Sequence, residues 1–171
     1  VLVGGPGVDT LFGGAGKDIY LFNRGDGTDF VSDTDANSSS PDASVLVLGD
    51  GVSRSDVMFR PGSLMVDLGL VDPADPGSPH DAIHFEGFDQ LDPAATTPLA
   101  EIRFADGSSM RYADILAQGF DVDGTEGNAD GAAGNSPMLV GTGATDRIRG
   151  FGGDDVLAGL PGDLDRPGII P

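Results

Sequence analysis

The chain has 171 residues, 28 acidic side chains against 9 basic ones, a formal net charge of -19 and no cysteine. This charge disfavours nucleic acid and anionic membrane surfaces as partners, and it opposes folding unless cations neutralise it. The absence of cysteine excludes disulfides and thiolate metal sites, and no apolar run is long enough to form a membrane-spanning helix.

A nonapeptide repeat opens the chain. Residues 4–12 read GGPGVDTLF and residues 13–21 read GGAGKDIYL, and the same frame returns in 141–149 and 150–158. Glycine allows a tight turn with its carbonyls pointed inward. The Asp at the sixth position adds a carboxylate, which gives the hard oxygen ligands that calcium prefers. The last three positions predict a short strand with one inward apolar side chain, and these inward residues are Leu11, Tyr20, Ile148 and Leu157.

This pattern resembles the haemolysin-type, repeats-in-toxin (RTX) family. The resemblance implies a parallel β-roll, in which two nonapeptides form one coil and Ca²⁺ binds between the turns of neighbouring coils. Partner carboxylates then come from repeats two apart. The metal-site residues that it implies are Gly5, Gly7, Asp9, Gly14, Gly16, Asp18, Asp26, Asp29, Asp146, Gly152, Asp155, Asp163 and Asp165.

The spacing leaves alternatives within the first array. Two repeats beyond Asp9 lies Gly27, which Asp26 and Asp29 flank, so either carboxylate is a candidate partner of Asp9. Asp18 needs a partner upstream of the first residue, or its site is closed by the loop that follows. The chain begins in mid-pattern, and we expect it to be a piece of a longer protein.

Residues 32–44 are predicted to be a polar loop, and residues 45–120 a β-rich block. The block is expected to contain an apolar strand in SVLVLGDG, a hairpin around Pro61-Gly62 and a strand in DAIHFEGF. A strand, an Asp106-Gly107 turn, a second strand and a short helix follow. These features resemble the haemolysin-type calcium-binding-related region that follows RTX arrays, which implies that the block caps the roll.

The remaining chain divides into a degenerate repeat or linker at 121–140 and C-terminal RTX repeats at 141–171, after an N-terminal array at 1–31. In the C-terminal repeats, position 164 lies two repeats beyond Asp146, between Asp163 and Asp165. Two repeats before Asp155 lies Pro137, which offers no carboxylate.

Other segments match the motifs of known metal and catalytic sites only weakly. His80, His84 and Glu86 do not have the His-Glu-x-x-His spacing of a helical zinc site, and DVDGTEG at 121–127 lacks the glycine that an EF-hand loop requires. No nucleophile frame, phosphate loop or dinucleotide fingerprint is present. The chain is therefore predicted not to be an enzyme.

The sequence thus predicts an all-β, calcium-binding module of a larger secreted bacterial protein. The RTX resemblance implies export through type I secretion machinery and folding on Ca²⁺ outside the cell. Two alternatives stay open: the C-terminal tail of a secreted protease, lipase or epimerase, or an adhesin or toxin spacer that binds a receptor or glycan.

Overall fold

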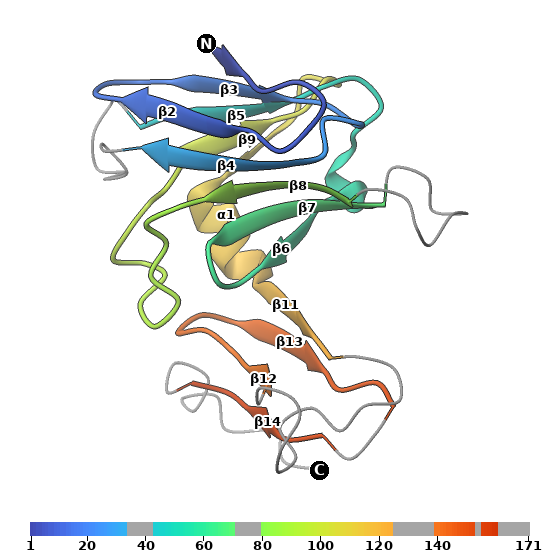
Figure 1. Ribbon diagram of the computed structural model, residues 1–171. Coiled ribbons are helices and arrows are strands. Elements are labelled where there is room, and N and C mark those ends of the chain that lie inside the picture. Colours follow the sequence, from blue (N-terminus) through green and yellow to red (C-terminus); the bar gives the residue numbers. More distant parts are fainter. Residues whose placement is uncertain (34–42, 71–79, 125–138, 153–154, 161–171) are drawn as a thin grey trace.

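The computed structural model describes residues 1–33, 43–70, 80–124, 139–152 and 155–160. These residues form mostly β-strands, with one short α-helix, α1 (Tyr112–Gln118), as Figure 1 shows. The expectation of an all-β fold is confirmed at this level, and the two large sheets mix parallel and antiparallel neighbours. Within the described ranges, no helix is long and apolar enough to cross a membrane.

The first five strands alternate between two sheets. Their bounds are β1 (Leu2–Val3), β2 (Thr10–Gly14), β3 (Ile19–Phe22), β4 (Thr28–Asp33) and β5 (Val45–Leu48). β1, β3 and β5 pair in parallel in one sheet, and β2 pairs in parallel with β4 in the other. The turns after β1 and β3 therefore lie on one edge of the molecule, here called the first edge. The turn after β2 and the end of β4 lie on the opposite, second edge.

The central block extends both sheets. Its strands are β6 (Met58–Arg60), β7 (Leu64–Leu70), β8 (His80–Phe85), β9 (Glu101–Arg103) and β10 (Ser109–Arg111). The sheet orders are β1-β3-β5-β9-β10 and β2-β4-β8-β7-β6. The hairpin around Pro61-Gly62 and the Asp106-Gly107 turn are confirmed, because β6 pairs antiparallel with β7 and β9 pairs antiparallel with β10. Each sheet runs without a break from the first array into the block, and the division into separate units stays a prediction.

A hydrophobic cluster fills the space between the sheets. Tyr20, Phe22, Phe59 and Phe85 are among its fully buried members. Strand alternation places Leu11 inside at 8 % exposure, while its neighbour Phe12 is 71 % exposed. The predicted inward positions of the first two nonapeptides, Leu11 and Tyr20, are thus confirmed.

The C-terminal strands form two small parallel pairs. β11 (Phe120–Asp123) pairs with β13 (Asp146–Arg149), and β12 (Leu139–Val140) pairs with β14 (Leu157–Ala158). These pairs lie beyond α1, at the opposite end of the molecule from β1 (Figure 1). The prediction that Leu157 is interior is wrong. It is 49 % exposed, since β14 has β12 as its only strand partner within the described part of the chain.

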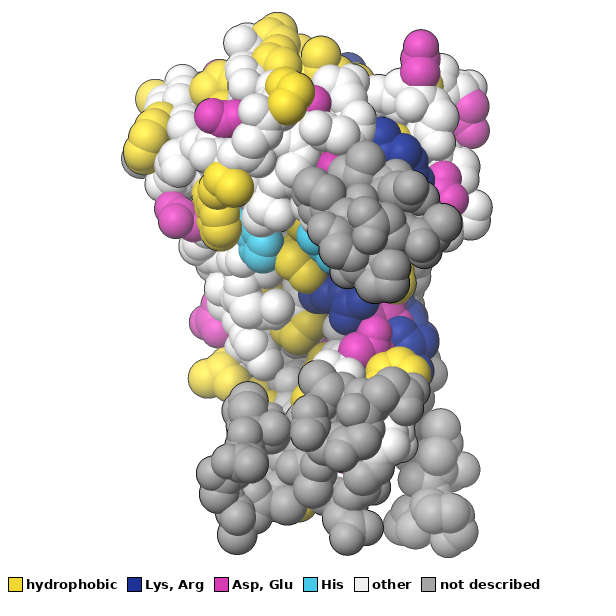
Figure 2. Space-filling model, turned by 45° about the vertical axis from the view of Figure 1, so that its right-hand side comes forward, with side chains coloured by type: hydrophobic (Ala, Val, Ile, Leu, Met, Phe, Trp, Pro, Cys, Tyr) yellow, Lys and Arg dark blue, Asp and Glu magenta, His cyan; other side chains and the backbone are white. Residues whose placement is uncertain are grey.

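Charged side chains join the β11–β13 pair to the central block. Arg60 in β6 donates through Nε to Asp67 at 2.6 Å and through Nη1 to Asp123 at 3.0 Å. Arg149 in turn binds both Asp123 and Asp121. Figure 2 shows basic and acidic side chains side by side on one face of the molecule.

Candidate calcium sites

The first glycine of each nonapeptide lies under the carboxylate of the same repeat. A Cβ atom added at this glycine would approach Asp Oδ2 to between 2.3 and 3.0 Å in all four repeats. The pairs are Gly4 with Asp9, Gly13 with Asp18, Gly141 with Asp146 and Gly150 with Asp155. The first position is therefore glycine for a steric reason, because the sixth-position carboxylate folds back over it.

The second and fourth glycines give the turn its shape. Gly5 and Gly7 have φ values of +83° and +145°, which residues other than glycine rarely adopt. The bridge between Gly7 and Gly27 places the 24–29 turn directly beside the 4–9 turn on the first edge. The segment RGDGTD at 24–29 is thus a third turn of the same frame, with Arg24 in the first position.

The partner of Asp9 across the first edge is Asp29. The Asp9 N–H donates to Asp29 Oδ1 at 3.0 Å. A Cβ on Gly4 would lie 2.7 Å from Asp29 Oδ2 and 3.0 Å from Asp9 Oδ2, so the two carboxylate oxygens lie within about 6 Å of each other, where like charges still repel strongly.

The register explains why spacing alone did not choose this pair. β1 and β3 pair at the expected two-repeat separation, Leu2 with Tyr20. Asp9 and Asp29, however, are 20 residues apart. Phe22 and Asn23, inserted after the second nonapeptide, account for the shift.

Asp29 is fully buried and incompletely paired. Its exposure is 0 %, and its Oδ2 atom has no hydrogen-bond partner. Burial raises the pKa of the Asp29 carboxyl above its usual value. The Asp9 and Asp26 carboxylates raise it further, against the hydrogen bond from the Asp9 N–H. A bound cation would compensate the charge of a buried carboxylate oxygen that has no donor.

Asp26, the other predicted alternative, makes different contacts. Its Oδ2 accepts hydrogen bonds from Asn23 N at 2.7 Å and from Asn23 Nδ2 at 3.1 Å. On the block side of the same turn, the buried Asp81 accepts from the N–H groups of Gly25 and Gly27 at 2.8 and 3.0 Å. Two backbone amides of the turn thus bind the Asp81 carboxylate. Sequence reasoning missed Asp81, because it lies outside every repeat.

A second group of oxygens lies on the second edge. A Cβ on Gly13 would lie 2.9 Å from both Asp18 Oδ2 and Asp33 Oδ2. Asp18 Oδ2 is buried without a hydrogen-bond partner. Asp33 Oδ2 accepts from the Tyr20 hydroxyl at 2.8 Å and from the Ser44 hydroxyl at 2.7 Å. Asp18 thus lies beside Asp33 and Ser44, and closure of a calcium site by the following loop stays a prediction.

The C-terminal repeats are arranged differently. Asp146 accepts from Thr142 N at 2.7 Å and from Thr142 Oγ1 at 2.9 Å, within its own turn. Its neighbour Arg147 donates to the carbonyls of Gln118 and Gly119 at the end of α1 and forms two hydrogen bonds with Asp121. A guanidinium therefore occupies a position lined by carbonyl and carboxylate oxygens. Gly152 and Asp155 are described, whereas Asp163, Asp165 and residues 125–138 of the predicted degenerate repeat or linker (121–140) lie outside the described residues.

The two edges of the first array fit calcium by their donor chemistry. Each offers two carboxylates, one orphaned buried oxygen and a glycine that leaves the space beside them open. Among the described residues, no group of three or more Asp, Glu or His side chains converges. Calcium takes about six to eight oxygens, so the turn carbonyls would have to supply the remainder.

Other polar groups have ordinary partners. His80 Nδ1 lies 3.3 Å from Asp67, whereas His84 Nδ1 lies 2.7 Å from the Ser63 hydroxyl. Burial lowers the pKa of His84, and its ring stacks on Phe30. The two histidines therefore contact different partners.

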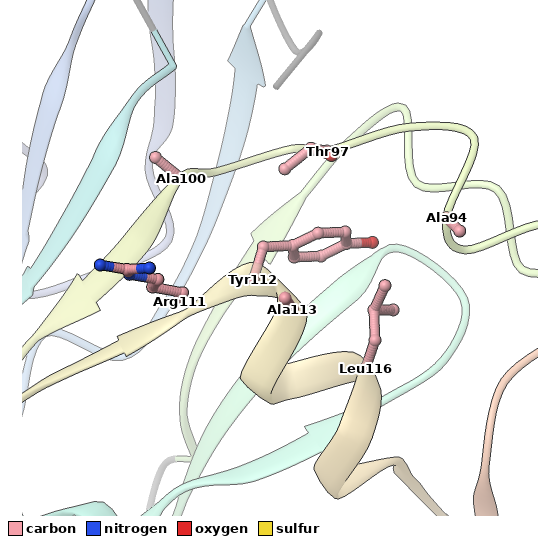
Figure 3. A pocket seen from close by; sticks show the side chains of 7 residues that line it. All are labelled: Ala94, Thr97, Ala100, Arg111, Tyr112, Ala113 and Leu116. Carbon is pink, nitrogen blue, oxygen red and sulfur yellow. The ribbon is translucent and has the colours of Figure 1, made fainter. Parts of the chain in front are cut away.

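A cavity of about 310 Å³ lies beside α1 (Figure 3). Tyr112 crosses it, and its hydroxyl donates to the Pro93 carbonyl at 2.7 Å. Arg111 is the charged residue among those that line it, and the others shown include Thr97 and Leu116. This lining offers no nucleophile paired with a base.

Comparison with known proteins places the repeats in a family. The family model for the RTX calcium-binding nonapeptide repeat matches in four copies, over residues 1–31 and 138–163. No curated protein and no solved structure matches the chain. The glycine-carboxylate geometry and the family match agree: these two segments are RTX calcium-binding nonapeptide repeats.

Proposed function

We propose that this chain is a calcium-dependent, non-catalytic module whose N-terminal array becomes ordered when calcium binds between its turns. The observation that carries the proposal is the Asp9–Asp29 pair. One of its oxygens is fully buried without a donor, and the turn around it is built from glycine. A cation that compensates the charge would stabilise such an arrangement.

The coupling to folding follows from charge and chain entropy. The chain carries a net charge of -19, and the closed turns bring pairs of carboxylates together. Glycine-rich turns lose more conformational entropy on closing than turns of other residues. Bound calcium supplies the opposite charge and shared ligation, so its binding free energy adds to the folding free energy of the array.

In architecture, we propose that β1 to β5 form a parallel β-roll that the central block caps. The strands β1 to β5 support this, since they alternate between two sheets with parallel neighbours. At the block end, the antiparallel strands β10 and β6 complete the two sheets. The antiparallel strands end the series of parallel coils.

In the cell, we propose that the parent protein is bacterial and secreted, and that the module folds after passage through type I secretion machinery. The RTX repeats support this, because their family is one of secreted proteins. A chain kept open by its own carboxylates where calcium is scarce, and closed where calcium is abundant, suits transport in an unfolded state.

A calcium titration of the full chain tests the proposal. Far-UV circular dichroism is recorded from chelator to millimolar calcium, with magnesium as the matched ion. We expect β-sheet signal to increase with calcium and not with magnesium, which demands smaller octahedral geometry. The variant Asp9→Asn should require higher calcium concentrations. An unchanged spectrum and no bound calcium by equilibrium dialysis would contradict the proposal.

A further inference from the structure

We propose that a second calcium site lies on the second edge and is completed by Asp33, a residue outside the nonapeptides, which the hydroxyls of Tyr20 and Ser44 hold in position. The inference rests on the proposed calcium function and adds specific residues to it. The family match covers residues 1–31 and 138–163, so neither Asp33 nor Ser44 lies in a matched repeat.

The carboxylates of Asp18 and Asp33 converge on one point. Both Oδ2 atoms lie 2.9 Å from the place where a Cβ on Gly13 would stand. They are therefore at most about 6 Å apart. One ion can bind two oxygens that are up to about 5 Å apart, since calcium–oxygen distances are about 2.3–2.6 Å, so an adjustment of about 1 Å or less lets one ion bind both. Asp18 Oδ2 is buried without a hydrogen-bond partner, so a cation bound beside it would compensate its charge.

Two hydroxyl groups orient Asp33 toward Asp18. The Tyr20 and Ser44 hydroxyls both donate to Asp33 Oδ2, at 2.8 and 2.7 Å. Ser44 Oγ also accepts from the Asp18 N–H at 3.1 Å, and it thereby ties the two halves of the site together.

Tyr20 connects this site to the core. It occupies the inward apolar position of its nonapeptide and is fully buried, while its hydroxyl reaches the edge of the roll. The same hydroxyl would lie 2.0 Å from a Cβ on Gly13, so the glycine is required by the phenol as well as by the carboxylates. Tyr20 is a positioning residue, because it acts on the ion through Asp33.

The site would also join the two ends of the polar loop. Asp33 ends β4, and Ser44 precedes β5 by one residue. An ion held by Asp18 and Asp33 would therefore link the second repeat turn to both ends of the connection between β4 and β5. Closing this connection lowers the entropy that the chain loses when β5 pairs with β3.

Terbium luminescence gives a direct test, because Tb³⁺ replaces Ca²⁺ and is excited by a neighbouring phenol. The chain has two tyrosines and no tryptophan. We expect sensitised emission in the wild type, loss of most of it in Tyr20→Phe, and full emission in Tyr112→Phe. Tyr112 is the matched control, since its buried hydroxyl bonds to the Pro93 carbonyl and not to a carboxylate. Emission that survives Tyr20→Phe would overturn the inference.

Calorimetric counting of bound calcium separates this inference from the proposed function. Asp33→Asn should remove one class of site and leave the class that Asp9→Asn removes. Ser44→Ala should weaken the second class about tenfold, since a hydrogen bond to a charged group contributes about 1.5 kcal/mol. Circular dichroism in calcium checks that each variant folds.

The outcomes of this counting are distinct. Calcium binding that Asp9→Asn weakens and that Asp33→Asn and Ser44→Ala leave unchanged would overturn the inference and preserve the proposed function. A wild type that binds no calcium would overturn both.

Discussion

The substitution Asp29→Asn tests whether unneutralised charge opposes closure of the first array. Asparagine has nearly the same size, and its Oδ1 can still accept the Asp9 N–H that Asp29 accepts at 3.0 Å. The change removes one of two charges within about 6 Å of each other, which repel by about 3 kcal/mol at an effective dielectric constant of about 20. We therefore expect the calcium-free array to be more stable by about 3 kcal/mol in the variant.

Native-state hydrogen exchange measures this difference locally. In chelator at neutral pH, the amides of β2 and β4 should exchange about a hundredfold more slowly in Asp29→Asn than in the wild type. In saturating calcium the order should reverse, because the variant lacks a ligand. Asp106→Asn, in an exposed turn, is the control and should change neither result. Faster exchange of Asp29→Asn in chelator would refute the electrostatic reasoning.

The stability of the calcium-free wild type should depend on pH in a way that the stability of Asp29→Asn does not. Burial raises the pKa of Asp29 in the folded state above its unfolded value, so the folded array binds this proton more tightly than the unfolded one. The stability of the calcium-free wild type should therefore fall as pH rises from the unfolded pKa, about 4, through the raised folded pKa. The calcium-free wild type should be less stable than Asp29→Asn at neutral pH. This difference in stability, measured by exchange rates corrected for intrinsic exchange, should disappear at acidic pH. A deficit that is the same at both ends of this range would contradict the assignment to Asp29.

Two further substitutions test packing and the ion pairs of the block. Gly13→Ala should displace the Tyr20 hydroxyl, which a Cβ would approach to 2.0 Å, and it should abolish calcium-dependent protection of β3; a variant with wild-type calcium affinity would contradict the steric argument. Arg60→Met should lower the free energy of unfolding in urea by about 3 kcal/mol, because it leaves the fully buried Asp67 without its guanidinium partner. Arg103→Met, which removes an exposed pair with Glu101, should cost less than about 1 kcal/mol, and equal losses in the two variants would show that burial of the partner is unimportant.

Much of the architecture could be predicted because its signals are local. The hairpin at Pro61-Gly62, the turn at Asp106-Gly107 and the short helix after it all depend on residues within a few positions of one another. The alternation of Leu11 inside and Phe12 outside also follows from strand geometry alone. The exposure of Leu157 could not be predicted in this way, since it depends on which elements cover β14.

The candidate sites divide along the same line. The amino-acid sequence by itself determined the turn chemistry. A Cβ at the first position would conflict with the sixth-position Asp, and both positions lie within one nonapeptide. Only the tertiary structure decided which carboxylates meet. The two-residue insertion at Phe22-Asn23 moves the partner of Asp9 to Asp29, and the return of the chain after β4 brings Asp33 to Asp18. Pairing across coils depends on register and on loop closure, and both are set by contacts between segments far apart in the chain.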